Sequence, residues 1–140
     1  MHQRKTKTRQ KKVTNKKTPN KTRKKKLAKK IADEELKQNK KIRIFLQINI
    51  GDEEQKSGIN KDCLNDFYSY CKNLNLDIVG LMCIPPVNNK SEIFFKEMAL
   101  LTKKLNLKEL SMGMSADYIE AAKNSATYLR IGSHIFGKRN

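Results

Sequence analysis

From Leu27 onward, strand-type and helix-type segments alternate along the chain, and this alternation constrains the fold more than any other feature of the sequence. Short apolar runs predict four strands, at 42–50, 77–84, 107–112 and 127–131. Apolar residues at helical spacing predict a helix before the first strand and one after each strand. Strands and helices that alternate in this way form βαβ units with a parallel sheet. We therefore predict the α/β class, and specifically a partial TIM barrel, the four C-terminal units of an eight-stranded parallel barrel.

Two of the predicted strands end in small-residue turns that open helices. Residues 110–115 read Leu-Ser-Met-Gly-Met-Ser, and residues 129–133 read Leu-Arg-Ile-Gly-Ser. A turn that opens a helix presents hydroxyls and unpaired backbone N–H groups, and these groups receive a phosphate well. Many TIM barrels bind phosphate after their last two strands. The consecutive turns therefore predict a phosphate site, with Arg130 in the second of the two strands.

The positive charge of the chain is concentrated at its N-terminus. The formal net charge is +17, and residues 1–26 contain 13 Lys and Arg residues and no Asp or Glu. Only Met1 and Val13 are apolar in this segment, so burial would not offset the entropy lost on ordering, and we predict a disordered Lys-rich tail over 1–26. Clustered lysine neutralises phosphates without a folded structure, which makes nucleic acid one candidate partner. A solvated leader without a partner is the alternative.

Cysteine use and hydropathy narrow the class of protein. No apolar run approaches the length of a membrane span, so no membrane partner is predicted. Cys63, Cys71 and Cys83 are too widely separated for a zinc knuckle, and the only histidines are His2 and His134. An odd number of free thiols fits a reducing cytoplasm. We predict a cytoplasmic protein without a metal site, in which the second and third cysteines are buried thiols.

Four sequence motifs follow one another in a fixed order along residues 27–140. They are Gln47–Ile50 with Glu54–Gly58, then Gly80–Pro85, then Leu110–Asp117, then Arg130–Gly137. In order and spacing they resemble the pyridoxal phosphate homeostasis protein family, a single-domain TIM barrel similar to the N-terminal domain of alanine racemase. The resemblance implies that 27–140 is a half-barrel domain that binds pyridoxal 5′-phosphate (PLP), serves vitamin B6 homeostasis in the cell and is not an enzyme.

The resemblance also implies which residues hold the cofactor. Carried over residue by residue, it places the phosphate on Ser111, Gly132 and Ser133, places Met112 and Gly113 near the ring or the phosphate, and places Arg130 opposite the pyridine nitrogen. An arginine stays protonated, so it would keep that nitrogen unprotonated and leave the cofactor a poorer electron sink. This arrangement suits carriage of the cofactor better than catalysis. The alternatives are an ion pair of the arginine with a nearby acid and packing or turn roles for the other residues.

The resemblance does not extend to the first half of the barrel. In the family, the lysine that forms the Schiff base lies on the first strand, and this sequence has no counterpart. We therefore predict a truncated member that binds PLP weakly and without a covalent bond, and Lys56, in a loop, does not replace that lysine. The two open edges of a half-barrel predict self-association or a partner that completes the barrel. A nucleic-acid-binding protein acting through 1–26 and a non-functional fragment are the alternative functions.

Overall fold

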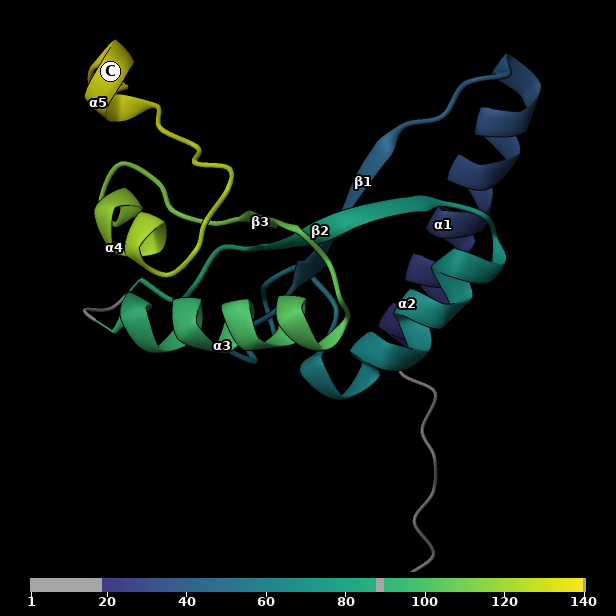
Figure 1. The fold of residues 1–140 in the computed structure, drawn as a ribbon, viewed down its shortest axis with the longest axis horizontal. Helices are drawn as coiled ribbons and strands as arrows, with labels where there is room; N and C mark the ends of the chain where they lie inside the picture. Colours follow the sequence, from purple (N-terminus) through teal and green to yellow (C-terminus); the bar gives the residue numbers. More distant parts are fainter. Residues whose placement is uncertain (1–18, 88–89, 140) are drawn as a thin grey trace, which may run out of the picture.

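The computed structural model describes residues 19–87 and 90–139, and a parallel sheet lies at its centre (Figure 1). The strands are β1 (Arg43–Ile48), β2 (Asp77–Cys83) and β3 (Glu109–Ser111), in the order β1-β2-β3, and both pairings are parallel. The helices are α1 (Pro19–Gln38), the single turn η1 (Lys61–Cys63), α2 (Leu64–Asn73), α3 (Ser91–Lys104), α4 (Tyr118–Lys123) and α5 (Ser133–Phe136). The predicted α/β class with a parallel sheet is confirmed.

The fourth predicted strand, 127–131, is not a strand of this sheet. The segment runs beside β3 and forms one isolated parallel bridge, between Ser111 and Tyr128. β3 ends at Ser111, and Gly113 then turns the chain with a φ of 96°. Because two consecutive N–H groups, those of Thr127 and Tyr128, both donate to the carbonyl of Leu110, at 2.8 and 3.1 Å, the spacing of a regular ladder is lost. The sheet of the described residues therefore has three strands where four were predicted.

Part of the predicted disordered segment is helical. α1 begins at Pro19, so the prediction of disorder was wrong for residues 19–26, and residues 1–18 lie outside the described part of the chain. Lysine and arginine are good helix formers, and proline is tolerated in the first turn of a helix. High charge density alone therefore did not prevent a helix here, because the helix continues into residues that pack on the core.

α1 packs on the core through its small residues. Ala28 and Ala32 are buried, whereas Leu27 and Leu36 are 59% and 79% exposed. The next carboxylate on the buried side is Glu35, which is only 7% exposed. The buried face of α1 is thus narrow: two methyl groups, the partly buried Ile31 packed against the core, and one charged side chain that needs hydrogen-bond partners.

Glu35 fixes the turn from α1 to β1 and makes stability depend on pH. Its carboxylate accepts hydrogen bonds from Lys41 Nζ at 2.9 Å and from the backbone N–H of Ile42 at 3.0 Å, and these bonds lower its pKa from the ordinary value of 4.5. A carboxyl with a lowered pKa in the folded state stabilises the fold above its ordinary pKa, and this stability is lost as the pH falls through the folded-state pKa.

We expect Glu35→Gln to be less stable than the parent protein at neutral pH, with a difference that shrinks as the pH falls below the ordinary carboxyl pKa of 4.5. Urea unfolding at a series of pH values from neutral to acid measures this difference. Glu54→Gln is the matched control, since Glu54 is exposed and forms no ion pair with any described residue. A difference from the parent that stays constant with pH would contradict the role given to Glu35.

The hydrophobic core lies between the sheet and the helices α2 and α3. Phe95 and Met98 of α3 and Leu81 of β2 are fully buried. The predicted buried thiols are confirmed, since Cys71 and Cys83 are 1% and 0% exposed, and burial raises their pKa to about 11 and about 12. Within residues 19–87 and 90–139, no cluster of His, Cys, Asp and Glu side chains could hold a metal ion. None of the helices described there is long and apolar enough to cross a membrane.

The outer edge of β1 is partly covered by the loop that follows it. Ile59 forms a parallel bridge with Ile48, donates its N–H to the carbonyl of Gln47 at 2.8 Å and accepts the N–H of Asn49 at 3.0 Å. In the described chain, no segment pairs with the first half of β1 on that side. Unpaired strand edges favour association with another chain, so self-association stays a prediction.

Candidate functional site

An open hollow of about 1650 Å³ lies beyond the carboxyl ends of β2 and β3. In parallel α/β sheets, ligands bind outside the carboxyl ends of the strands. The hollow is lined by the loop after β2, by the turn between β3 and α4, and by the segment that leads into α5. Four of the six predicted cofactor residues line it, namely Gly113, Arg130, Gly132 and Ser133. The two small-residue turns, which are separated in sequence, thus border one space.

The other two predicted residues, Ser111 and Met112, lie deeper, at the end of β3. Ser111 is 7% exposed, and Met112 is fully buried in the hydrophobic core. The backbone N–H of Met112 donates to the carbonyl of Tyr128 at 3.2 Å. Neither residue lines the hollow, so their contact with a cofactor stays a prediction. Met112 packs in the hydrophobic core, as the packing alternative predicted.

The first turn is held rigidly against α4. Gly113 has a φ of 96°, and a Cβ built on it would lie 2.5 Å from the Cβ of Ala121. The residue therefore has to be glycine both for its backbone conformation and for the close approach of the helix. The next residue, Met114, donates its N–H to the carboxylate of Asp117 at 2.8 Å, which closes the turn.

Ser115 joins the first turn to the second. Its hydroxyl accepts hydrogen bonds from the backbone N–H groups of Gly132 and His134, both at 3.3 Å. Serine favours the N-cap position, yet Ser115 does not cap the helix that follows, because α4 begins at Tyr118 and Asp117 occupies the N-cap position. The local pattern of the sequence contains no signal for this long-range contact, since the partners lie 17 and 19 residues away.

Ser133 is the member of the second turn whose polar groups remain available. It is exposed, and neither its hydroxyl nor its backbone N–H has a hydrogen-bond partner in the described part of the chain. Gly132, before it, has an ordinary φ of −121°, and a Cβ built there would meet no atom within 4 Å. Packing within the described part of the chain therefore does not explain why residue 132 is glycine.

Arg130 brings a partly buried positive charge to the hollow. Its Nη2 donates to the carbonyl of Cys83 at 2.7 Å, while its buried Nε has no hydrogen-bond partner among the described residues. Burial lowers the pKa of Arg130, although a guanidinium stays protonated in proteins. None of the carboxylates in the described ranges forms an ion pair with it, so the ion-pair alternative is not observed there. An unpaired polar hydrogen at a buried cation is costly unless an acceptor binds to it.

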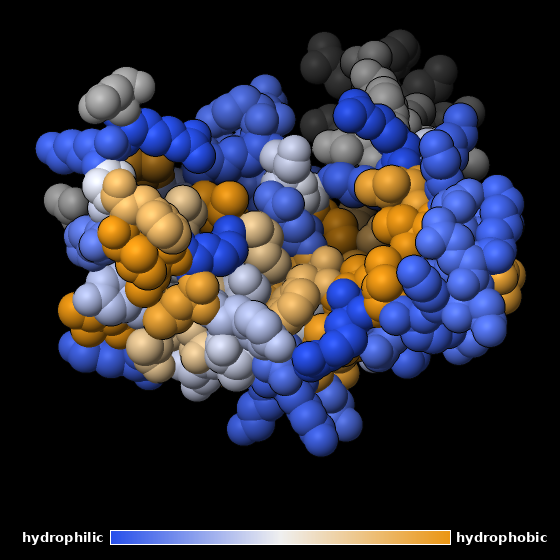
Figure 2. Space-filling model, turned by 90° about the horizontal axis from the view of Figure 1, so that it is seen from above, coloured by the Kyte–Doolittle hydropathy of each residue, from blue (hydrophilic) through white to orange (hydrophobic). Residues whose placement is uncertain are grey.

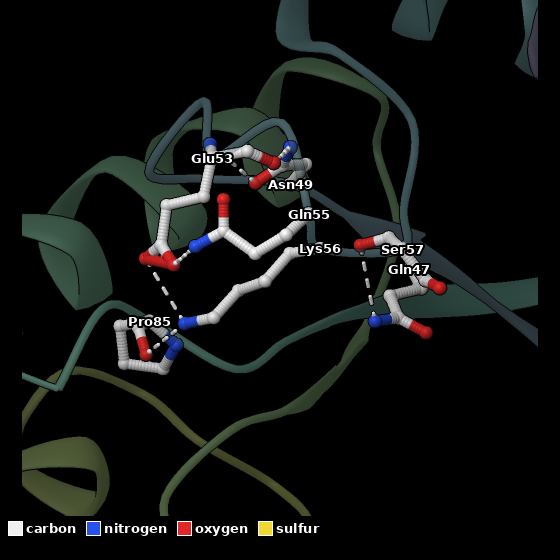
Figure 3. Close-up of polar contacts among 7 residues, drawn as sticks. All are labelled: Gln47, Asn49, Glu53, Gln55, Lys56, Ser57 and Pro85. Atoms are coloured by element: carbon white, nitrogen blue, oxygen red, sulfur yellow. Dashed lines mark hydrogen bonds and ion pairs between the residues drawn. The ribbon is translucent and has the colours of Figure 1, made fainter.

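Lys56 ties the loop after β1 to the rim of the hollow (Figure 3). Its Nζ donates to the carbonyl of Pro85, a lining residue, at 3.1 Å and forms an ion pair with Glu53 at 3.0 Å. The base of the loop is fixed by Asn49, whose amide donates to the carbonyl of Glu53 at 2.8 Å and accepts its N–H at 3.2 Å. The amine of Lys56 is therefore occupied by protein groups, and sequence motifs alone did not reveal these partners.

Comparison with known proteins identifies the family of this α/β domain. Residues 22–140 match the family described as the alanine racemase N-terminal domain, and the chain belongs to that family. Two solved structures of PipY from Synechococcus elongatus are similar to the chain at 27% sequence identity. The structure without PLP has a TM-score of 0.71 and the match covers 80% of this chain and 57% of PipY. The structure with PLP bound has a TM-score of 0.61 and the match covers 78% and 54%.

The relatives in sequence carry the name that the four motifs suggested. The pyridoxal phosphate homeostasis protein of Haemophilus influenzae is 40% identical over 126 residues, a match that covers 79% of this chain and 53% of the relative. The human protein of that name is 34% identical over 116 residues, covering 71% of this chain and 42% of the relative. The predicted resemblance is confirmed. The chain spans about half the length of the curated relatives it matches.

Proposed function

We propose that this chain is a cytoplasmic PLP-binding protein of vitamin B6 homeostasis, and that it holds the cofactor in the hollow beyond β2 and β3. The observation that carries the proposal is the buried, unpartnered Nε of Arg130 in a hollow that the Gly132–Ser133 turn also lines. A chain similar to this one, PipY, has been solved with PLP bound, which supports the choice of ligand.

The residues of the hollow fit a phosphorylated ligand. Ser133 offers a free hydroxyl and a free N–H, and the absence of a side chain at Gly132 leaves open space for a bulky anion beside them. Arg130 supplies a fixed positive charge and a donor without a partner. In the proposal, the turn receives the phosphate, and Arg130 donates to the ring nitrogen. When bound, PLP supplies a reactive aldehyde on an electron-withdrawing ring.

We further propose that binding by residues 19–140 is weak and non-covalent, and that the role is carriage and not catalysis. Lys56, which lies within the first motif, has its amine engaged by Glu53 and by the carbonyl of Pro85. Since Arg130 does not exchange its proton near neutral pH, it orients the ring and does not act as an acid or base there. The relatives are named for homeostasis of PLP and not for a reaction.

Titration of the full chain with PLP tests the proposal, followed by the absorbance of the cofactor and by equilibrium dialysis. We expect saturable binding that Arg130→Gln weakens by about tenfold or more, since a hydrogen bond to a charged group contributes about 1.5–3 kcal/mol. Lys108→Gln removes one exposed charge away from the hollow and is the matched control. Pyridoxal without the phosphate should bind more weakly than PLP. Absence of saturable binding, or equal affinity in both variants, would contradict the proposal.

A further inference from the structure

α1 presents a row of basic side chains on the face opposite the core. Arg23, Lys26 and Lys30 follow one another at i, i+3 and i+7, a spacing that places them on one side of a helix. All three are exposed, and Ala28 and Ala32, on the other side, are buried. The row therefore points away from the core. α1 lies at the right of the molecule in Figure 1, and Figure 2 shows mainly hydrophilic residues along that side.

The fold neutralises this row only weakly and at one end, where the carboxylate of Glu34, one turn after Lys30, interacts electrostatically with it. Elsewhere on α1, Lys29 pairs with Asp33 at 2.7 Å and Lys37 with Glu34 at 2.8 Å. In contrast, Arg23, Lys26 and Lys30 form no ion pair with any described residue. The acidic residues of α1 all lie in its C-terminal half, so the N-terminal half carries positive charge alone.

The surroundings of α1 are mainly basic. A hollow of about 700 Å³ on this helix is lined by six lysines and by two acids, Asp33 and Glu34. One of the lysines, Lys21, pairs with Asp66 of α2 at 3.7 Å. In the sequence, residues 1–18 add eight Lys and Arg and no Asp or Glu before the helix. α1 and α5 lie at opposite sides of the molecule (Figure 1), so this surface is separate from the proposed cofactor site.

The chemistry of the row selects the class of partner. A helix that binds a membrane surface needs a continuous apolar face to insert. The exposed apolar residues of α1, Leu27 and Leu36, lie nine positions apart and so on opposite sides of the helix, and Ala28 and Ala32 are buried in the core. α1 contains no aromatic residue on which a base could stack. Arg23 and Lys30 are about 10 Å apart along the axis, at 1.5 Å per residue. A row of this length can reach more than one phosphate of a strand, and the charge of the row, not its spacing, indicates the partner.

We propose that the outer face of α1, through Arg23, Lys26 and Lys30, binds the phosphate backbone of duplex nucleic acid without reading its sequence. Contacts of lysine and arginine with phosphates release counterions, and the affinity consequently falls steeply with salt. The interaction differs from the proposed cofactor site in residues, in location and in ligand, so each can be lost without the other.

The experiment measures binding of the full chain to labelled 20-base-pair duplexes of RNA and of DNA, by fluorescence anisotropy at a series of salt concentrations. The triple variant Arg23→Gln, Lys26→Gln, Lys30→Gln is compared with the matched triple variant Lys103→Gln, Lys104→Gln, Lys108→Gln, which removes the same charge from exposed positions on α3 and after it. Glutamine is a good helix former, so both helices are retained, and circular dichroism verifies this.

We expect the α1 variant to reduce the slope of log affinity against log salt by about 2.7, since each phosphate contact contributes about 0.9. The α3 variant should leave the slope unchanged, and both variants should bind PLP as the parent does. Binding to only one of the two duplexes would also support the proposal, and it would show whether the partner is RNA or DNA. Equal slopes in the two variants, or binding to phosphatidylserine vesicles with none to either duplex, would overturn the proposal.

Discussion

Replacing Gly80 by alanine is expected to destabilise the protein by about 3 kcal/mol or more, because no room exists for a methyl group between β2 and β3. A Cβ built on Gly80 would lie 2.1 Å from the carbonyl oxygen of Glu109 and 2.6 Å from its carbonyl carbon. Both are backbone atoms of the paired strand, so no side-chain rotation relieves the clash. Urea unfolding followed by circular dichroism measures the loss, and the yield of soluble protein measures it where the variant does not fold.

Gly132→Ala is the control for this prediction. A Cβ at Gly132 would meet no atom within 4 Å, so the added methyl group causes no clash, and the loss of stability should be about 1 kcal/mol or less. Two substitutions of the same type thus separate a glycine that the fold requires from one that it does not. A Gly80→Ala variant as stable as the parent would show that β2 and β3 do not pair at the register of Gly80 with Glu109.

The sequence predicted those parts of the fold that depend on local pattern. The strands around Leu46, Leu81 and Leu110 are continuous apolar runs, as expected for a parallel sheet buried by helices, and all three residues are buried. The burial of Cys71 and Cys83 followed from their places in a helical stripe and in a strand. The family motifs predicted the two turns, which the structure brings to one hollow.

The parts that sequence reasoning missed depend on contacts between distant residues. Asn60 and Ser91 have the side chains of N-caps, yet neither forms a capping hydrogen bond. Ser115 was assigned to the helix that follows it, but its hydroxyl receives N–H groups from the other turn. N-cap propensity says which side chains can accept an N–H group at the start of a helix. It does not say which backbone N–H group will lie nearest to that side chain in the folded chain.

The basic segment of α1 shows that composition, too, predicts only part of the structure. A segment with five Lys and Arg and no acid between Pro19 and Lys26 has the composition of a disordered tail. The packing of Ala28 and Ala32 nonetheless secures the helix to which this segment belongs. Composition was therefore informative about the charge of the surface, and uninformative about its structure, because one buried turn is enough to order the turns beside it.

Replacing Gly132 by valine is expected to reduce the affinity for PLP by about a hundredfold while leaving the fold intact, a separation that no purely structural role would produce. A Cβ at Gly132 would meet no atom within 4 Å and the residue is exposed, so the fold should tolerate the substitution. In the proposed complex the same space receives the phosphate, beside the free hydroxyl of Ser133, and the branched side chain would exclude it.

The two measurements for this variant are PLP titration and urea unfolding, made on the same preparation. Gly132→Ala should give an intermediate loss of affinity, because one methyl group fills less of the space than a branched side chain. If the phosphate is the group that is excluded, the loss should be large for PLP and small for pyridoxal. Unchanged affinity for PLP in Gly132→Val would place the phosphate away from this turn, and the glycine would then have no functional role in the hollow.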